Sequence, residues 1–148
     1  MYRQGDVFLV AVEAIPKKAA KQPRDRGRVV LAYGEVTGHA HAIKTEGAVL
    51  LRTDDGEQYL DVAGDFSGPV GGVIVERDET SVTVTTERQG RVKFALADID
   101  EVAGVVIPKR PWSPLVHEEH TAHAIPAGKY RRPAQREYSP AEIRNVAD

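Results

Sequence analysis

Residues 73–96 read VIVERDETSVTVTTERQGRVKFAL, and this stretch decides the fold class that the sequence predicts. It contains three runs rich in valine, threonine and other residues that favour extended backbone, separated by two short polar turns. The runs span residues 73–77, 81–86 and 91–96. Short runs of this kind, bounded by turn residues, are typical of antiparallel strands. We therefore expect three consecutive strands joined by tight turns.

Segments of the same character occur on both sides of this stretch. They span residues 6–13, 28–33, 48–52, 58–63 and 102–107. The Asp55-Gly56 step between two of them is a strong hairpin-turn signal. Helix is expected only near the C-terminus, where Ser139 can serve as N-cap and Glu142 can complete a capping box. The pattern predicts a mainly β protein, a small barrel or sandwich with a short C-terminal helix.

The composition narrows the function classes before any motif is considered. The chain has 148 residues, of which 41% are hydrophobic and 28% charged, as is typical of a globular protein. It contains no cysteine, so disulfides, thiolate metal sites and cysteine nucleophiles are excluded. Neither an apolar run of membrane-spanning length nor a signal-peptide pattern is present. We therefore expect a cytoplasmic protein in which imidazole and oxygen ligands would hold any metal.

The middle of the chain, residues 66–112, has the features of a separate unit. A glycine-led strand, an acidic turn, a Thr/Val strand and a glycine turn are followed by a strand that closes on Leu-x-Asp-Ile at 96–99. In this order of features the segment resembles the small Sm/SH3-like barrel at the C-terminus of the ribosome-assembly factor RimP. The resemblance implies a small β-barrel inserted into a histidine-bearing β domain made of residues 1–65 and 113–148. A single continuous β domain is the alternative.

All five histidines lie in two short stretches, and this clustering is the strongest functional signal in the sequence. They are His39 and His41 in the first stretch and His117, His120 and His123 in the second. Histidines placed independently would rarely fall into two such narrow windows. If the middle of the chain is an insertion, the two stretches are close neighbours in the host domain.

The first stretch reads Gly38-His39-Ala40-His41. In an extended strand, residues i and i+2 project from the same face, about 6–7 Å apart along the chain. Two imidazoles placed in this way can chelate one metal ion, and the alanine between them leaves room. The pair alone is a modest signal, which the second stretch strengthens.

The second stretch reads His-Glu-Glu-His at 117–120. His117 and His120 share one face if the segment turns helically. Glu118 and Glu119 are available as metal ligand, as partner of a ligand, or as general base. The spacing differs from the His-Glu-x-x-His of zinc proteases, whose histidines are four positions apart on a helix. A metalloprotease is therefore excluded.

Together the two stretches predict a single site. Paired imidazoles with a carboxylate suit a divalent metal, namely Zn²⁺, Mn²⁺, Fe²⁺ or Ni²⁺. The predicted metal ligands are His39, His41, His117 and His120. The candidate catalytic residues are Glu118, Glu119, His120 and Arg136. His123 is assigned a peripheral role. The alternative is that the histidines are exposed in polar turns and hydrogen-bonded to backbone carbonyls.

Two further resemblances bear on this site. His39, His41 and Glu46 have the His-x-His-x₄-Glu spacing of the first cupin motif, and similarity to cupins implies a metal-binding β-barrel with Glu46 as a ligand. The second cupin motif places its histidine after a Pro-x-Gly turn, whereas here His117 and His120 precede that turn, so the match is partial.

Outside residues 66–112 the chain also resembles a group of short, functionally uncharacterised bacterial and phage proteins. The segments that carry this resemblance are YRQGDV, VVLAYGEVTGHAHAI, HEEH, PAGKY and QREYSPAEI. It implies a shared core that includes the histidines but brings no activity with it.

Charge is distributed unevenly along the chain. Residues 1–31 carry seven Lys or Arg against three Asp or Glu, residues 109–148 carry seven against five, and the region between is acidic. If the basic ends meet, they can form a positive face for an anionic substrate such as RNA or another phosphate ester. Arg136 could then bind a phosphate bidentately. Gln4 and Asp6 could line the same pocket or clamp the first strand to the last.

These observations leave three functions open. The first is a small metalloenzyme, hydrolytic, acting on RNA or another phosphate ester with a metal-bound water. The second is a metal-independent ribonuclease in which two histidines act as acid and base. The third is a non-catalytic module that binds RNA or a protein, with structural histidines.

Overall fold

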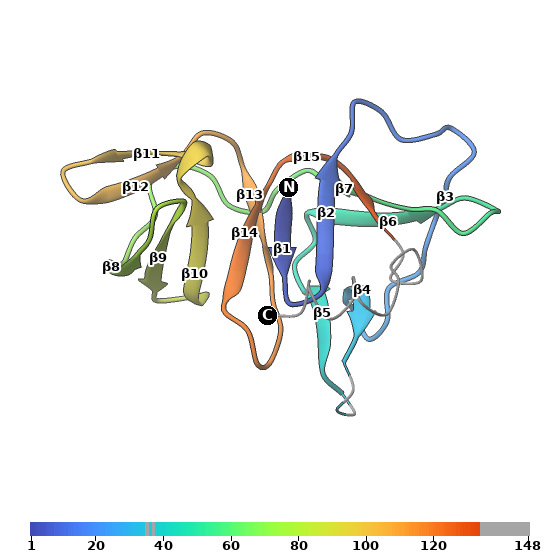
Figure 1. Ribbon diagram of the computed structural model, residues 1–148, viewed down its shortest axis with the longest axis horizontal. Coiled ribbons are helices and arrows are strands. Elements are labelled where there is room, and N and C mark those ends of the chain that lie inside the picture. Colours follow the sequence, from blue (N-terminus) through green and yellow to red (C-terminus); the bar gives the residue numbers. More distant parts are fainter. Residues whose placement is uncertain (35, 37, 134–148) are drawn as a thin grey trace.

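The computed structural model describes residues 1–34, 36 and 38–133, and these residues are mainly β (Figure 1). The strands are β1 (Tyr2–Gln4), β2 (Val7–Ala11), β3 (Ala20–Lys21), β4 (Val29–Tyr33), β5 (Ala40–Ile43), β6 (Ala48–Arg52), β7 (Gln58–Val62), β8 (Val73–Arg77), β9 (Ser81–Thr86), β10 (Gly90–Ala95), β11 (Ile99–Val102), β12 (Val105–Pro108), β13 (Trp112–Leu115), β14 (Ala122–Pro126) and β15 (Gly128–Arg132). One short 3₁₀ turn, η1 (Leu96–Asp98), lies between β10 and β11. The predicted fold class is confirmed. The predicted C-terminal helix lies outside the described residues.

Two larger sheets and two ribbons make up the molecule. The first sheet has the order β1-β2-β15-β7-β6-β3, and the second has the order β13-β14-β10-β9-β8. All neighbouring strands are antiparallel except β10 and β14, which run parallel. The ribbons are β4–β5 and β11–β12. None of the sheets formed by the described residues closes on itself, so the fold is sandwich-like and not a closed barrel.

Each larger sheet covers its own apolar core. The first core is built from alternate residues of β2, β4, β6 and β7, together with Leu115, Ile125 and Tyr130. The second is built from β9 and β10 with Trp112, Ala122 and Ala124. Strand β14 contributes to both cores, because Ile125 faces the first and its neighbours Ala122 and Ala124 face the second. The β13–β14 hairpin therefore joins the two cores, as its central position in Figure 1 shows.

The two ends of segment 66–112 meet where the chain leaves and re-enters the first core. The Phe66 N–H donates to the Trp112 carbonyl at 3.0 Å, and the Trp112 N–H donates to the Phe66 carbonyl at 2.9 Å. An inserted unit requires ends that meet in this way. The division into residues 1–65 with 113–148 and an inserted 66–112 nevertheless stays a prediction.

Most of the predicted strands occur at the expected positions, with one error. The strand expected over residues 102–107 is two strands, β11 and β12, separated by a turn. Ala103 and Gly104 both have positive φ, 49° and 79°, and such backbone reverses the chain. The valines on either side of the turn form the strand pattern on which the prediction was based.

No helix long and apolar enough to cross a membrane occurs among the residues that the structure describes.

Candidate metal centre

The two histidine stretches are brought together by a backbone bridge. The Ala42 N–H of β5 donates to the Val116 carbonyl at 3.0 Å, and the Val116 N–H donates to the Ala42 carbonyl at 2.8 Å. This pair locks β5 against the residue that follows β13. His41 and His117, the neighbours of the paired residues, therefore lie side by side, although 76 positions separate them.

Three imidazoles converge at this point. His41, His117 and His120 each offer one ring nitrogen, and these nitrogens all lie within 4.8 Å of one another. The ring centroids are 4.3 Å apart for His41 and His117, 4.8 Å for His117 and His120, and 5.6 Å for His41 and His120. Such a group could hold a metal ion.

Gln4 of β1 fixes the orientation of the His41 ring. Its side-chain NH₂ donates to the Leu115 carbonyl at 2.8 Å and to the Thr121 carbonyl at 3.0 Å, so its oxygen must face His41. That oxygen lies 2.8 Å from His41 Nδ1 and can only accept, which places the ring proton on Nδ1. The lone pair of His41 is therefore on Nε2. A metal-binding histidine is usually held by such a hydrogen bond to its other ring nitrogen.

The surroundings of His41 also keep its ring neutral. His41 is only 5% exposed, and burial, together with the neighbouring His117, lowers its pKa to about 4 even though Asp6 favours the charged form. His117 is more exposed, but burial and the charge of His120 lower its pKa as well. Neutral imidazoles are the form that binds metal, and both shifts favour that form.

Two glycines leave space beside the ring nitrogens. A Cβ added to Gly5, whose φ is +59°, would lie 3.1 Å from His120 Nε2 and 3.3 Å from His41 Nε2. A Cβ added to Gly34 would lie 3.5 Å from His117 Nε2. The turn between β1 and β2 can thus approach His41 and His120 this closely only because Gly5 lacks a side chain, whereas a Cβ at Gly34 would make ordinary van der Waals contact with His117.

His117 has a different tautomer from His41 in this arrangement. The Glu119 N–H donates to His117 Nδ1 at 3.0 Å, so in the neutral ring the proton is on Nε2. Binding of a metal at Nε2 would require this hydrogen bond to break. The same geometry gives His41 a free lone pair beside an N–H donor of His117, an arrangement that can also support acid–base chemistry.

The carboxylates of the second stretch have separate surroundings. Glu119 Oε1 lies 3.4 Å from His39 Nδ1 at the rim of the site, and both side chains are accessible. Glu118 instead accepts a 2.8 Å hydrogen bond from the Ala40 N–H, at the start of β5. Burial of Glu118 acts to raise its pKa, but this hydrogen bond and the nearby His117 outweigh it and lower the pKa. Glu119 is thus the carboxylate with more freedom to act on a substrate.

The histidine rings open onto a pocket of about 430 Å³. Its lining includes His39, Glu119 and Asp6, whose carboxylate lies 3.9 Å from His41 Nε2. On the other side of the loop, His117 and His120 also line a second hollow of about 490 Å³. The loop 117–120 therefore lies between two hollows.

The structure places the remaining candidates as follows. His39 is adjacent to the three-histidine group, with its ring centroid 6.0 Å from that of His117, but is not part of it. His123 lies on β14 and lines a different pocket. Glu46, the cupin-type ligand, is exposed and is not in the group. Residues 117–120 form a bend and not a helical turn. Arg136 lies outside the described residues.

Sequence reasoning did not single out Gly5, and it gave Gln4 only as a possible lining residue. Both residues are more than 30 positions from the nearest histidine, although both lie in the YRQGDV segment. A glycine next to the buried start of a strand is a signal that could have drawn attention to Gly5.

The fold and site define a mainly β protein with a candidate three-histidine metal centre. Residues 3–68 match the model of a family described as a domain of unknown function (DUF8820). The match supports the predicted relation to an uncharacterised group of small proteins, and it includes Gln4, Gly5 and His41. No curated protein and no solved structure matches the chain significantly. The comparisons lend no support to the resemblances to RimP or to cupins.

Proposed function

We propose that this protein is a small metal-dependent hydrolase that binds one divalent ion through His41, His117 and His120. The single observation that supports this most is the convergence of three imidazole nitrogens within 4.8 Å of one another. Three protein ligands with a further position left open are typical of catalytic metal sites, whereas structural sites usually have four.

The donor set indicates which metals would bind. The ligands are neutral imidazoles, and the chain has no thiolate to offer. Imidazole with a nearby carboxylate suits Zn²⁺, Mn²⁺, Fe²⁺ or Ni²⁺. Gln4 would hold His41 with Nε2 directed at the ion, and Asp6, 3.9 Å from that nitrogen, would be available as an oxygen ligand.

A bound metal would supply a water molecule of lowered pKa as nucleophile. Glu119 is positioned to take a proton from such a water, because its carboxylate is accessible at the pocket and lies near His39. His39 would hold that carboxylate in place and, when protonated, could donate to a leaving group. In this proposal Glu119 and His39, at the rim of the pocket, are the catalytic residues, and His41, His117 and His120 are the metal ligands.

The charged residues that line the pocket are Asp6 and Glu119, so a bound divalent ion would supply most of the positive charge for an anionic substrate. Arg132 of β15 is close enough that its positive charge contributes to lowering the pKa of His41. A cation beside an open pocket attracts phosphate groups. We therefore propose RNA or another phosphate ester as the substrate class.

Metal analysis of tag-free protein tests the proposal. We expect about one equivalent of metal per chain, or its uptake on titration with Zn²⁺ or Mn²⁺, and loss of that uptake in His41→Ala and His117→Ala. His123→Ala is the matched control and should bind as the wild type does. Absence of metal together with absence of uptake would refute the proposal.

A second candidate function is metal-independent cleavage of RNA by a histidine acid–base pair. Two hydrogen bonds favour it: the bond from the Glu119 N–H to His117 Nδ1 leaves an N–H on His117, and the bond between His41 Nδ1 and Gln4 leaves a lone pair on His41. Cleavage of RNA that survives EDTA, with a bell-shaped pH profile, would support this candidate. If neither metal uptake nor cleavage is found, a binding module remains.

A further inference from the structure

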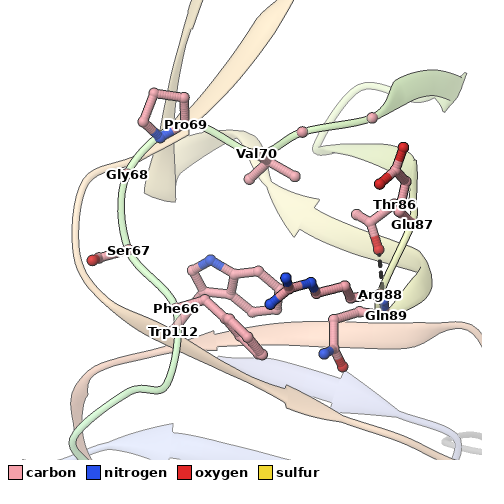
Figure 2. A pocket seen from close by; sticks show the side chains of 12 residues that line it. Phe66, Ser67, Gly68, Pro69, Val70, Thr86, Glu87, Arg88, Gln89 and Trp112 are labelled. Carbon is pink, nitrogen blue, oxygen red and sulfur yellow. Dashed lines mark hydrogen bonds between the residues drawn. The ribbon is translucent and has the colours of Figure 1, made fainter.

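A further pocket, which no histidine lines, lies over the second core. It has a volume of about 420 Å³ and is enclosed by segment 66–72, which follows β7, and by the turn between β9 and β10 (Figure 2). Its apolar lining includes Phe66, Val70 and Trp112. Pockets of this size with apolar walls and a few polar groups are typical of small-molecule sites.

Close backbone packing shapes one wall of this pocket. A Cβ added to Gly72, whose φ is +150°, would lie 2.3 Å from the Thr85 carbonyl oxygen. Segment 66–72 can therefore cross β9 at this short distance only with glycine at this position. At its other end the segment is fixed by the Phe66–Trp112 backbone pair. Both ends of segment 66–72 are fixed by backbone packing, so this wall of the pocket is set by the fold.

Trp112 presents an unpartnered hydrogen-bond donor to this pocket. Its side chain is held between Phe66 and Phe94, each with its ring centroid 5.0 Å from that of the tryptophan, and the residue is only 4% exposed. Within the part of the chain that the structure describes, the indole N–H has no hydrogen-bond partner. Figure 2 shows the nitrogen-bearing edge of the indole turned toward segment 67–70. The indole N–H keeps contact with solvent in the pocket and is available to a ligand that accepts.

The polar side chains of the turn add further donors. Arg88 is exposed, and neither Arg88 nor the side chain of Gln89 is paired with any described residue. Figure 2 shows the Arg88 side chain extending toward the indole, whereas the carboxylate of Glu87 points away from it. A guanidinium at the edge of an apolar pocket is suited to a carboxylate, which can accept two hydrogen bonds from it.

We propose that this pocket binds a small aromatic carboxylate. The flat ring would lie against Phe66, Val70 and the indole, and the carboxylate would accept hydrogen bonds from Arg88. A neutral aromatic alcohol of the same size would leave the guanidinium without a counter-charge. An aromatic ammonium would be repelled by it.

Trp112 can also report ligand binding by NMR, because it is the one tryptophan in the chain. Its indole N–H gives a single, unambiguous cross-peak in a ¹H–¹⁵N correlation spectrum. We would titrate the full chain with benzoate, benzyl alcohol and benzylammonium. The expected result is a saturable shift of the indole peak with benzoate, and a much weaker response to the other two.

Two variants make the test specific. Arg88→Met should weaken benzoate binding about tenfold, which is the size expected for loss of a charge-assisted hydrogen bond. Arg88 is exposed, so this variant should fold normally. The matched control is Arg52→Met, an exposed arginine on β6, which should leave binding unchanged. No indole shift with benzoate, an equal shift with benzyl alcohol, or unchanged binding in Arg88→Met would overturn the proposal.

Discussion

Replacement of Gln4 by methionine should lower both the stability of the fold and the affinity of the histidine site for metal. Gln4 is 1% exposed, and its side chain makes three hydrogen bonds, one with His41 Nδ1 and two with the carbonyls of Leu115 and Thr121. Methionine has a similar length and volume but makes none of these bonds. The change therefore removes the polar contacts and leaves the packing almost intact.

The structure indicates the size of the effect. Each intramolecular hydrogen bond contributes about 1 kcal/mol net, and three are lost, so the free energy of unfolding should fall by ~3 kcal/mol. His41 would also lose the acceptor that fixes its proton on Nδ1. Loss of such a supporting hydrogen bond typically weakens metal binding by about 10–100-fold.

The two effects are measured separately. Urea denaturation of the metal-free protein gives the stability, and competition with a chelator gives the affinity for Zn²⁺. Ser113→Ala is the matched control, since Ser113 is fully buried and bonds to Asp65, away from the histidines. It should lose about 1 kcal/mol of stability and keep its metal affinity. A Gln4→Met variant that is destabilised but binds Zn²⁺ as tightly as wild type would show that Gln4 serves the fold alone.

Three further predictions concern the same site. Because the pKa of His41 is about 4 in the folded chain and about 6.5 when unfolded, the free energy of unfolding of the metal-free protein should fall by up to ~3 kcal/mol as the pH drops from 6.5 to 4. In His41→Gln, urea denaturation across that range should show a much smaller dependence, which comes from His117. Gly5→Ala should lose about 1–2 kcal/mol of stability, because alanine is strained at a φ of +59°. It should also bind Zn²⁺ more weakly, because the new methyl would lie 3.1 Å from His120 Nε2. Unchanged affinity for Zn²⁺ would contradict the inferred position of the ion. Glu119→Gln should still bind the metal but should lower the rate of phosphodiester hydrolysis by about 100-fold. Glu118→Gln should lower that rate less. An equal loss of rate in the two variants would argue against Glu119 as the base.

The strands that the sequence predicted are those with a long, regular pattern. Residues 73–77, 81–86 and 48–52 match the observed strands residue for residue. The strands that were not predicted, such as β1, β3 and β13, are two to four residues long, and β13 contains Pro114. Such strands exist because their neighbours pair with them, and local sequence holds little information about that pairing.

The tetrapeptide Ala-His-Ala-Ile shows why the site could be predicted only in part. It occurs at 40–43 and again at 122–125, and both copies are in strands. His41 is buried against Gln4 in the histidine group, whereas His123 is half-buried and lines another pocket. Identical local sequence therefore gives one candidate ligand and one peripheral residue. The difference comes from the residues that pack across from each copy.

The candidate metal centre needs residues both from the segment that matches the family and from the rest of the chain, so neither part alone contains the whole site. The segment that matches the family, residues 3–68, contains Gln4 and His41, but His117 and His120 lie beyond it. The two parts are also structurally dependent on each other, since Gln4 donates to carbonyls of residues 115 and 121 and β5 is bridged to Val116. The matched segment alone would therefore lose the acceptors that orient Gln4 as well as two of the three imidazoles. Relatives of this chain that bind a metal in the same way should therefore also have a His-x-x-His segment that packs near the end of the first strand.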